Sequence, residues 1–225
     1  MEETGRGFDV IRIDVTDTRA LSDAALFEQW LRRMPAERQE KVNAIRFEKG
    51  KRLSLAAGML LEQALDAAQV TDRQMAYGEN GKPYLTAAEN VFFNLSHSGH
   101  YAVCALSSHD IGVDVEHLRK FRENLIRRVF LPEEVSRIRE TYDNPDEGFT
   151  ALWTVKESVM KFFGTGIRLM PERIRVDSFA PLRVSCEDYD CAALRFAQYP
   201  LEDGVLTACA AEGEFPERVS VMSLS

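Results

Sequence analysis

Hydrophobic and polar residues alternate near the start of the chain. Ile11, Ile13 and Val15 are separated by polar residues, and this period of two predicts a β-strand over residues 8–15. Apolar positions then recur at helical spacing and predict helices over residues 26–34, 35–45 and 53–65. The third of these carries one continuous apolar face, which is typical of a helix packed on a core.

The centre of the chain predicts short strands and the second half predicts helices followed by strands. Asn80-Gly81 is a tight-turn signal. Alternation predicts strands over residues 91–96, 101–107 and 111–116, with His97 to His100 separating the first two. Helical spacing returns over residues 122–139, in two pieces, and over 147–163. From residue 174 onward, short β-like runs predict a second sheet.

The two halves of the chain show a faint internal similarity. Residues 99–106 (GHYAVCAL) align with residues 204–211 (GVLTACAA) at the same spacing, and a long predicted helix precedes each segment. This pattern favours an α+β protein that arose by duplication of one α+β unit. No linker-like stretch separates the halves, so we expect them to pack tightly together.

Composition narrows the class of protein. The chain has 225 residues, 45% of them hydrophobic, and a net charge of −8, as expected of a globular protein without general affinity for nucleic acid. We expect no membrane span and, because the first residues lack a secretory signal, a cytoplasmic location. The four cysteines are scattered, which favours reduced thiols.

The strand over residues 111–116 carries two acidic side chains on one face. Its apolar residues face one side, which leaves Gly112, Asp114 and Glu116 on the other. The backbones of the two acidic residues are about 6.5 to 7 Å apart, close enough for both carboxylates to bind one ion. A solvated strand edge is the alternative, although Gly112 leaves room for a ligand to approach.

The predicted helix over residues 147–163 places Trp153, Glu157 and Lys161 on one stripe. Glu157 and Lys161 could form an ordinary surface ion pair or serve a site. Lys156 falls on the opposite, apolar arc, where an ammonium group needs an anion; it either extends past the edge of the core or serves a site.

Several polar residues could bind phosphate. Each is a weak signal alone, and His97 is more often a hydrogen-bonded structural histidine than a ligand. A zinc site that combines His97, His100 and Cys104 is not favoured, because the spacing fits no common zinc site. The candidates are Arg38, Lys41, Arg52, Lys82, Ser96 and His97.

Three segments together resemble a known family. GVDVE at residues 112–116 is followed by WTVKESVMK at residues 153–161 and preceded by FNLSHS at residues 93–98. This combination is similar to the Sfp-type 4′-phosphopantetheinyl transferases. The resemblance implies two α+β lobes related by a pseudo-twofold axis with the active site between them: an N-terminal lobe (1–107) with coenzyme A phosphate contacts, and a C-terminal lobe (108–225) with the metal and catalytic motifs.

The resemblance also implies an activity. Enzymes of this family move the phosphopantetheine arm of coenzyme A to a serine of an acyl or peptidyl carrier protein and release adenosine 3′,5′-bisphosphate. It implies that Asp114, Glu116 and Glu157 bind Mg²⁺ or Mn²⁺, which the motifs do not distinguish. Glu157 would be the general base, and Lys161 would contact the diphosphate. The remaining phosphate and nucleotide contacts would come from Arg38, Lys41, Arg52, Lys82, Ser96 and His97.

A carrier protein is acidic, as this chain is, so docking needs a local basic patch. Residues Arg119 to Phe130 combine basic and apolar side chains and suit this role. An amphipathic helix with a solvated basic face is an equally good interpretation. Because both lobes lie in one chain, we expect a monomer.

Three other functions remain open at the level of sequence. The first is an inactive module that binds coenzyme A or a carrier protein. The second is a metal-dependent hydrolase of a nucleotide diphosphate, which would use water as the nucleophile. The third is a purely structural protein, in which the acidic strand and Lys156 are coincidences.

Overall fold

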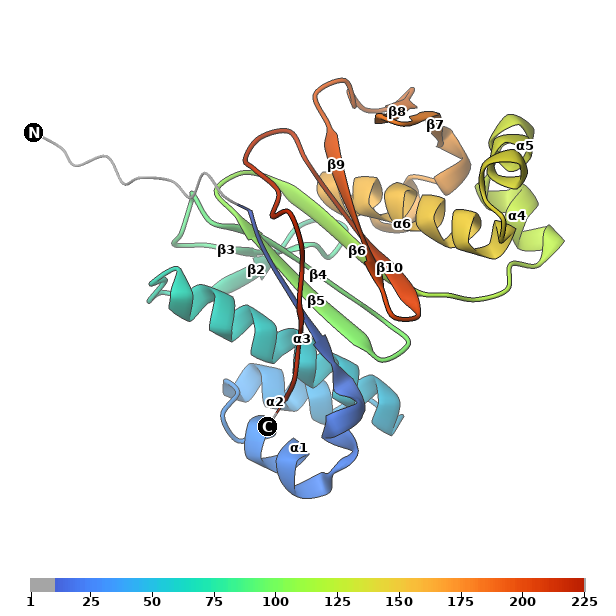
Figure 1. Ribbon diagram of the computed structural model, residues 1–225. Coiled ribbons are helices and arrows are strands. Elements are labelled where there is room, and N and C mark those ends of the chain that lie inside the picture. The colour runs from blue at the N-terminus through green and yellow to red at the C-terminus, as the bar shows by residue number, and fades with distance from the viewer. Residues whose placement is uncertain (1–10, 225) are drawn as a thin grey trace, which may run out of the picture.

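The computed structural model (Figure 1) describes residues 11–224, apart from the side chain of Ile167. Residues 8–10 of the first predicted strand therefore lie outside the described residues. The N-terminal half contains β1 (Arg12–Asp17), a 3₁₀ helix (Thr18–Ser22), α1 (Ala24–Leu31), α2 (Ala36–Asn43), α3 (Glu48–Ala67), β2 (Met75–Tyr77), β3 (Pro83–Leu85), β4 (Phe92–Ser98) and β5 (Tyr101–Ser107).

The C-terminal half begins with the acidic strand. It contains β6 (Ile111–His117), α4 (Glu123–Val129), α5 (Pro132–Thr141), α6 (Pro145–Phe163), two 3₁₀ helices (Gly166–Arg168 and Pro171–Arg173), β7 (Ile174–Phe179), β8 (Leu182–Cys186), β9 (Arg195–Leu201), β10 (Gly204–Ala210) and β11 (Val221–Met222). The predicted α+β class is confirmed, and the two-piece helical segment after residue 122 is α4 and α5.

The main sheets of the two halves have the same strand order. In the first, β5 lies between β1 and β4; in the second, β10 lies between β6 and β9, and all of these neighbours are antiparallel. β11 extends the first sheet by pairing in parallel with β1. A long helix packs on each sheet: α3 on β5, and α6 on β6 and β10. This equivalence agrees with the internal similarity of residues 99–106 and 204–211.

The hydrophobic core has three parts. One lies between the N-terminal helices and their sheet, one between α6 and the C-terminal sheet, and one between the two sheets. Figure 1 shows the consequence: α3 and α6 lie on opposite sides of the molecule, with the sheets between them. Among the described residues, none of the helices combines the length and apolar character needed to cross a membrane.

Polar side chains of β4 join the two sheets. Asn94 Oδ1 accepts a hydrogen bond from the backbone N–H of Val113 at 2.9 Å, and Ser96 Oγ accepts one from Val115 at 3.4 Å. A buried backbone N–H without a hydrogen-bond partner is costly. Asn94 and Ser96 therefore accept the hydrogen bonds that the backbone of a neighbouring strand would otherwise accept. β4 also extends to Ser98, two residues beyond the predicted end of the strand at residue 96.

Gly112 has a different role from the one predicted. A Cβ atom there would lie 2.0 Å from Ser158 O and 2.6 Å from Phe162 N. The space beside Gly112 is therefore filled by the backbone of α6 and is not open to a ligand. The absence of a side chain lets α6 pack directly on β6, and this close packing brings the helix stripe beside the acidic strand.

Candidate active site

Asp114, on β6, is buried, with 4% of its surface exposed. Its Oδ1 accepts hydrogen bonds from Ser96 Oγ at 2.7 Å and Lys161 Nζ at 2.6 Å. Burial raises the pKa of Asp114, against the opposing effect of Lys161 and Ser96. Its second oxygen, Oδ2, is buried and has no hydrogen-bond partner among the described residues. A buried carboxylate oxygen without a partner is unusual and points to a missing cation or donor.

Glu116 lies two residues further along the same face. Its Oε1 accepts a hydrogen bond from Trp153 Nε1 at 3.1 Å, and its Oε2 accepts one from Ser98 Oγ. Arg119 Nη2 is 3.8 Å from Oε1. These contacts come from β4, α6 and the segment after β6, so they fix the carboxylate from both halves of the chain.

Glu157 is one turn before Lys161 on α6, as the predicted stripe requires. Burial and, to a smaller extent, the charge of Asp114 raise its pKa to about 7, although Lys161 opposes the shift. No hydrogen bond or ion pair reaches this carboxylate from residues 11–224. The oxygens of this carboxylate are therefore available to accept a proton, and its pKa suits a general base at neutral pH.

One cavity of about 420 Å³ joins most of the predicted site residues. It lies where β4, β6, α2, α3 and α6 meet, so both halves supply its walls. Three cationic side chains and one imidazole opposite three carboxylates suit an anionic ligand that carries a metal ion. The cavity is lined by Arg38, Lys41, Ser54, Ala57, Pro83, Leu95, Ser96, His97, Asp114, Glu116, Glu157 and Lys161.

Two of the basic side chains of this cavity, Arg38 and Lys41, come from α2. Arg38 lies across α3 at Gly58, where a Cβ atom would be 2.9 Å from its Nε. Burial and the charge of Arg38 lower the pKa of Lys41. Burial lowers the pKa of His97 as well, so its imidazole is neutral at pH 7 and can donate only one hydrogen bond.

Two predicted phosphate ligands lie outside this cavity. Arg52 lines a neighbouring cavity of about 580 Å³, which shares Glu116 with the first. Lys82 donates to Phe162 O at 2.8 Å near the C-terminus of α6 and is 3.4 Å from Asp110 Oδ1. Burial lowers the pKa of Lys82. In this structure its ammonium satisfies a helix-end carbonyl.

Lys156 does neither of the two things predicted for it. It is fully buried, and its Nζ donates to Glu134 Oε2 at 2.7 Å and to Val129 O at 2.8 Å. It therefore neither extends past the edge of the core nor lines the 420 Å³ cavity. Glu134 is the anion that the position of Lys156 required.

The donor set around Asp114 fits a hard divalent cation. The three carboxylates, one of which has a buried unpartnered oxygen, supply the oxygen ligands that Mg²⁺ prefers. One oxygen from each of these three carboxylates cannot be chosen so that all lie within 4.8 Å of one another. Among residues 11–224, only His100, His117 and Asp203 place their ligand atoms that close together. Lys161 lies against Asp114 and partly neutralises it.

Comparison with known proteins identifies the family. Residues 110–209 match the family model of the 4′-phosphopantetheinyl transferase superfamily, and residues 22–109 match that of the 4′-phosphopantetheinyl transferase N-terminal domain. A 4′-phosphopantetheinyl transferase of Bacillus subtilis is 30% identical over 198 residues, which cover 83% of this chain and 86% of that protein. The chain belongs to the Sfp-type 4′-phosphopantetheinyl transferase family. The recognition made from the motifs is thereby confirmed.

Other relatives agree. The transferase Sfp of Bacillus subtilis strain 168 is 26% identical over 87% of this chain and 90% of its own length. HetI of a Nostoc species, also a 4′-phosphopantetheinyl transferase, is 39% identical over 103 residues, 43% of this chain and 44% of its own. The protein is therefore a 4′-phosphopantetheinyl transferase, in a family that uses coenzyme A.

Sequence reasoning did not identify which side chains contact Glu116 and Lys156. Ser98 and Trp153 donate to Glu116, and Glu134 pairs with Lys156 outside the cavity. The alternation of Asn94, Ser96 and Ser98 was the available signal, because three polar residues on one face of an otherwise buried strand require partners. No local pattern identifies Glu134, which is on another helix.

Proposed function

We propose that this transferase moves 4′-phosphopantetheine from coenzyme A to a serine of an apo acyl or peptidyl carrier protein, with Mg²⁺ as cofactor, and releases adenosine 3′,5′-bisphosphate. The observation that carries this proposal is the buried, unpartnered Oδ2 of Asp114 in a cavity with two further carboxylates and four cationic or imidazole side chains. We propose the lobes 1–107 and 108–225 as the units that supply its two walls.

Asp114, Glu116 and Glu157 would hold the metal. When bound, Mg²⁺ supplies charge neutralisation for the diphosphate as the phosphoryl group is transferred. Trp153 and Ser98 orient Glu116 for this role, because each donates to a different oxygen. Restrained ligands lose little freedom on binding a cation.

Glu157 would accept the proton of the carrier serine. The serine oxygen then forms a bond with the β-phosphorus of coenzyme A, and the bond from that phosphorus to the leaving adenosine bisphosphate breaks. In the metal-free structure burial raises the pKa of Glu157 to about 7, which favours acceptance of a proton by this carboxylate. Lys161, one turn away, would stabilise charge on the phosphoryl oxygens while it remains close to Asp114.

The nucleotide end of coenzyme A would bind to the basic wall. Arg38 and Lys41 on α2 face the same cavity as Ser96 and His97 on β4. Neutral His97 can donate a hydrogen bond to a phosphate oxygen. Arg52 and Lys82 line adjoining cavities; we propose that they contact more distant parts of the nucleotide.

The docking segment requires a narrower definition. Ile126, Val129 and Phe130 are each 3% exposed and belong to the C-terminal core, so they are not available to a partner. Arg127 and Arg128 remain exposed. We propose that the acidic carrier protein contacts the basic face of α4 through these arginines, and that one chain is a complete enzyme.

Intact-mass spectrometry of an apo carrier protein tests this function. The carrier is incubated with coenzyme A, Mg²⁺ and either wild-type enzyme, Asp114→Asn or Glu157→Gln. We expect the carrier to gain one phosphopantetheine with wild-type enzyme, and the rate to fall by about 100-fold or more in each variant. No gain despite binding of coenzyme A would instead favour an inactive module, and release of adenosine bisphosphate without carrier would favour a hydrolase.

A further inference from the structure

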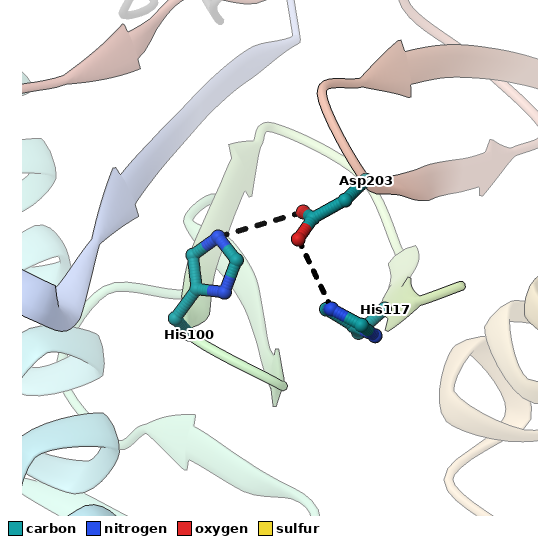
Figure 2. Close-up of side chains that lie close together, drawn as sticks. All are labelled: His100, His117 and Asp203. Atoms are coloured by element: carbon teal, nitrogen blue, oxygen red, sulfur yellow. Dashed lines mark ion pairs between the residues drawn. The ribbon is translucent and has the colours of Figure 1, made fainter. Parts of the chain in front are cut away.

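Three side chains outside the 420 Å³ cavity converge where the halves of the chain meet (Figure 2). His100 lies in the turn between β4 and β5, His117 at the end of β6, and Asp203 in the turn between β9 and β10. His117 Nε2 is 3.0 Å from Asp203 Oδ2, and His100 Nε2 is 3.5 Å from Asp203 Oδ1. One ligand atom from each residue lies within 4.8 Å of the other two.

The polar groups around these side chains leave His100 incompletely satisfied. His100 Nε2 is buried and has no hydrogen-bond partner among the described residues. Its other acidic neighbour is Asp17, whose Oδ2 is 3.9 Å away. Asp203 Oδ1 also accepts the hydroxyl of Tyr101 at 2.8 Å. Both carboxylates approach His100 Nε2 without forming a hydrogen bond with it, so this nitrogen can still bind a metal ion.

Asp203 is the carboxylate that both imidazole rings approach. Asp17 is more distant, with its Oδ2 3.9 Å from His100 Nε2. Two imidazoles and the carboxylate of Asp203 therefore form a set of donors suited to a divalent cation.

The chemistry of this set differs from that of the Asp114 cavity. Two imidazole nitrogens with one carboxylate favour a borderline transition metal over Mg²⁺, which prefers oxygen ligands throughout. The two histidines also line the cavity of about 580 Å³ that contains Arg52. A metal bound to three protein ligands would therefore have a solvent-facing position for a fourth ligand.

We propose that His100, His117 and Asp203 form a transition-metal site, best suited to Zn²⁺, that links the two halves of the protein. His100 belongs to the N-terminal sheet, whereas His117 and Asp203 belong to the C-terminal one. A metal ion that binds the folded protein and not the unfolded chain stabilises the association of the two halves by mass action. The three proposed ligands are distinct from Asp114, Glu116 and Glu157.

Co²⁺ is the probe for this site because its visible absorption reports the ligands that surround it. Untagged protein is titrated with Co²⁺ in the presence of excess Mg²⁺, which occupies the carboxylates, and then with Zn²⁺. We expect saturable visible absorption at one Co²⁺ per chain, loss of that absorption when Zn²⁺ displaces Co²⁺, and a higher melting temperature with Zn²⁺ than with Mg²⁺ alone.

Variants show whether these three residues are the ligands. We expect His100→Asn, His117→Asn and Asp203→Asn each to weaken Co²⁺ binding by about 10-fold or more. His109→Asn is the matched control, because His109 likewise lies beside a carboxylate, with its Nε2 3.2 Å from Glu212 Oε2, but is outside the group. It should bind Co²⁺ as wild type does.

Two results would overturn the proposal. One is the absence of saturable Co²⁺ absorption and of a Zn²⁺-dependent rise in melting temperature in the wild-type protein. The other is equal Co²⁺ affinity in His100→Asn and His109→Asn. The wild-type thermal measurement does not depend on any variant, so the proposal can fail even if a substitution prevents folding.

Discussion

Lys156 and Glu134 form an ion pair from which solvent is excluded. The distance from Lys156 Nζ to Glu134 Oε2 is 2.7 Å, and the two side chains are 0% and 1% exposed. Glu134 Oε1 also accepts the backbone N–H of Val176 at 2.7 Å, and Oε2 accepts that of Leu131 at 2.8 Å. One pair therefore connects α6, the junction of α4 and α5, and β7, on the side of α6 away from the cavity.

Replacing Lys156 by Met should destabilise the protein and leave its affinity for coenzyme A unchanged. Loss of one partner leaves Glu134 buried and uncompensated, a change that costs about 3–5 kcal/mol of unfolding free energy. Urea denaturation measures this loss, and KM for coenzyme A is measured well below the melting temperature.

Lys120→Met is the control, because Lys120 is exposed and should tolerate the change. A double-mutant cycle with Glu134→Gln should show strong coupling between the two residues. If KM for coenzyme A rose in Lys156→Met while stability did not fall, Lys156 would be a phosphate ligand and its assignment to the core would be wrong.

Replacing Glu157 by Gln should stabilise the metal-free protein above pH 7. The pKa of Glu157 is raised from 4.5 to about 7, so the folded state binds the proton more tightly than the unfolded state does. Its ionisation therefore reduces stability as pH rises from about 4.5 to about 7, and the full reduction persists above that range. Glutamine removes this contribution because it has no charge.

Thermal unfolding in the presence of a chelator measures the effect. We expect Glu157→Gln to melt a few degrees above wild type at pH 8 and close to wild type at pH 4.5. Excess Mg²⁺ at pH 8 should raise the melting temperature of wild type more than that of the variant. A difference between the two proteins that is the same at both pH values would contradict the raised pKa.

The sequence predicted the carboxylate site because its residues are arranged by local periodicity. Asp114 and Glu116 share a face of a strand with period two, and Glu157 and Lys161 share a face of a helix at i and i+4. Both periods hold in the structure. Which surface each face meets depends on packing, and the motif resemblance supplied that information.

The errors arose where contacts join distant parts of the chain. The partner of Lys156 is 22 residues away on another helix, and His100, His117 and Asp203 meet only when the two sheets pack together. The space beside Gly112 is filled by a helix from later in the sequence. A local sequence pattern carries no information about contacts between distant residues. The sequence alone could therefore show that Lys156 required a partner, but it could not identify that partner.

Gly112→Ala should destabilise the protein more than an ordinary glycine substitution. The added Cβ atom would lie 2.0 Å from the backbone oxygen of Ser158, so α6 would have to move away from β6. Overpacking of this kind costs about 1–3 kcal/mol or more. Because α6 carries Glu157 and Lys161, we also expect kcat to fall.

Gly78→Ala provides the comparison. A Cβ atom at Gly78 would be 3.6 Å from Lys82 O, an ordinary contact distance. Chemical denaturation and initial rates of carrier modification are measured for both variants. Equal stability and equal rates in the two variants would show that the packing of α6 on β6 adapts easily and does not determine the position of the site.

Charge reversal on α4 should impair use of the carrier protein without affecting coenzyme A. Arg127 and Arg128 are exposed, whereas Ile126 and Val129 of the same helix are buried in the core. Rim charges mainly affect the association rate, so Arg127→Glu with Arg128→Glu should raise KM for an acidic carrier by about 10-fold. The effect should shrink at high salt because exposed charges are screened. Arg32→Glu with Arg33→Glu, an exposed double reversal at the end of α1, is the matched control. If the control raised KM for the carrier equally, net charge alone would explain the effect and the docking face would have to lie elsewhere.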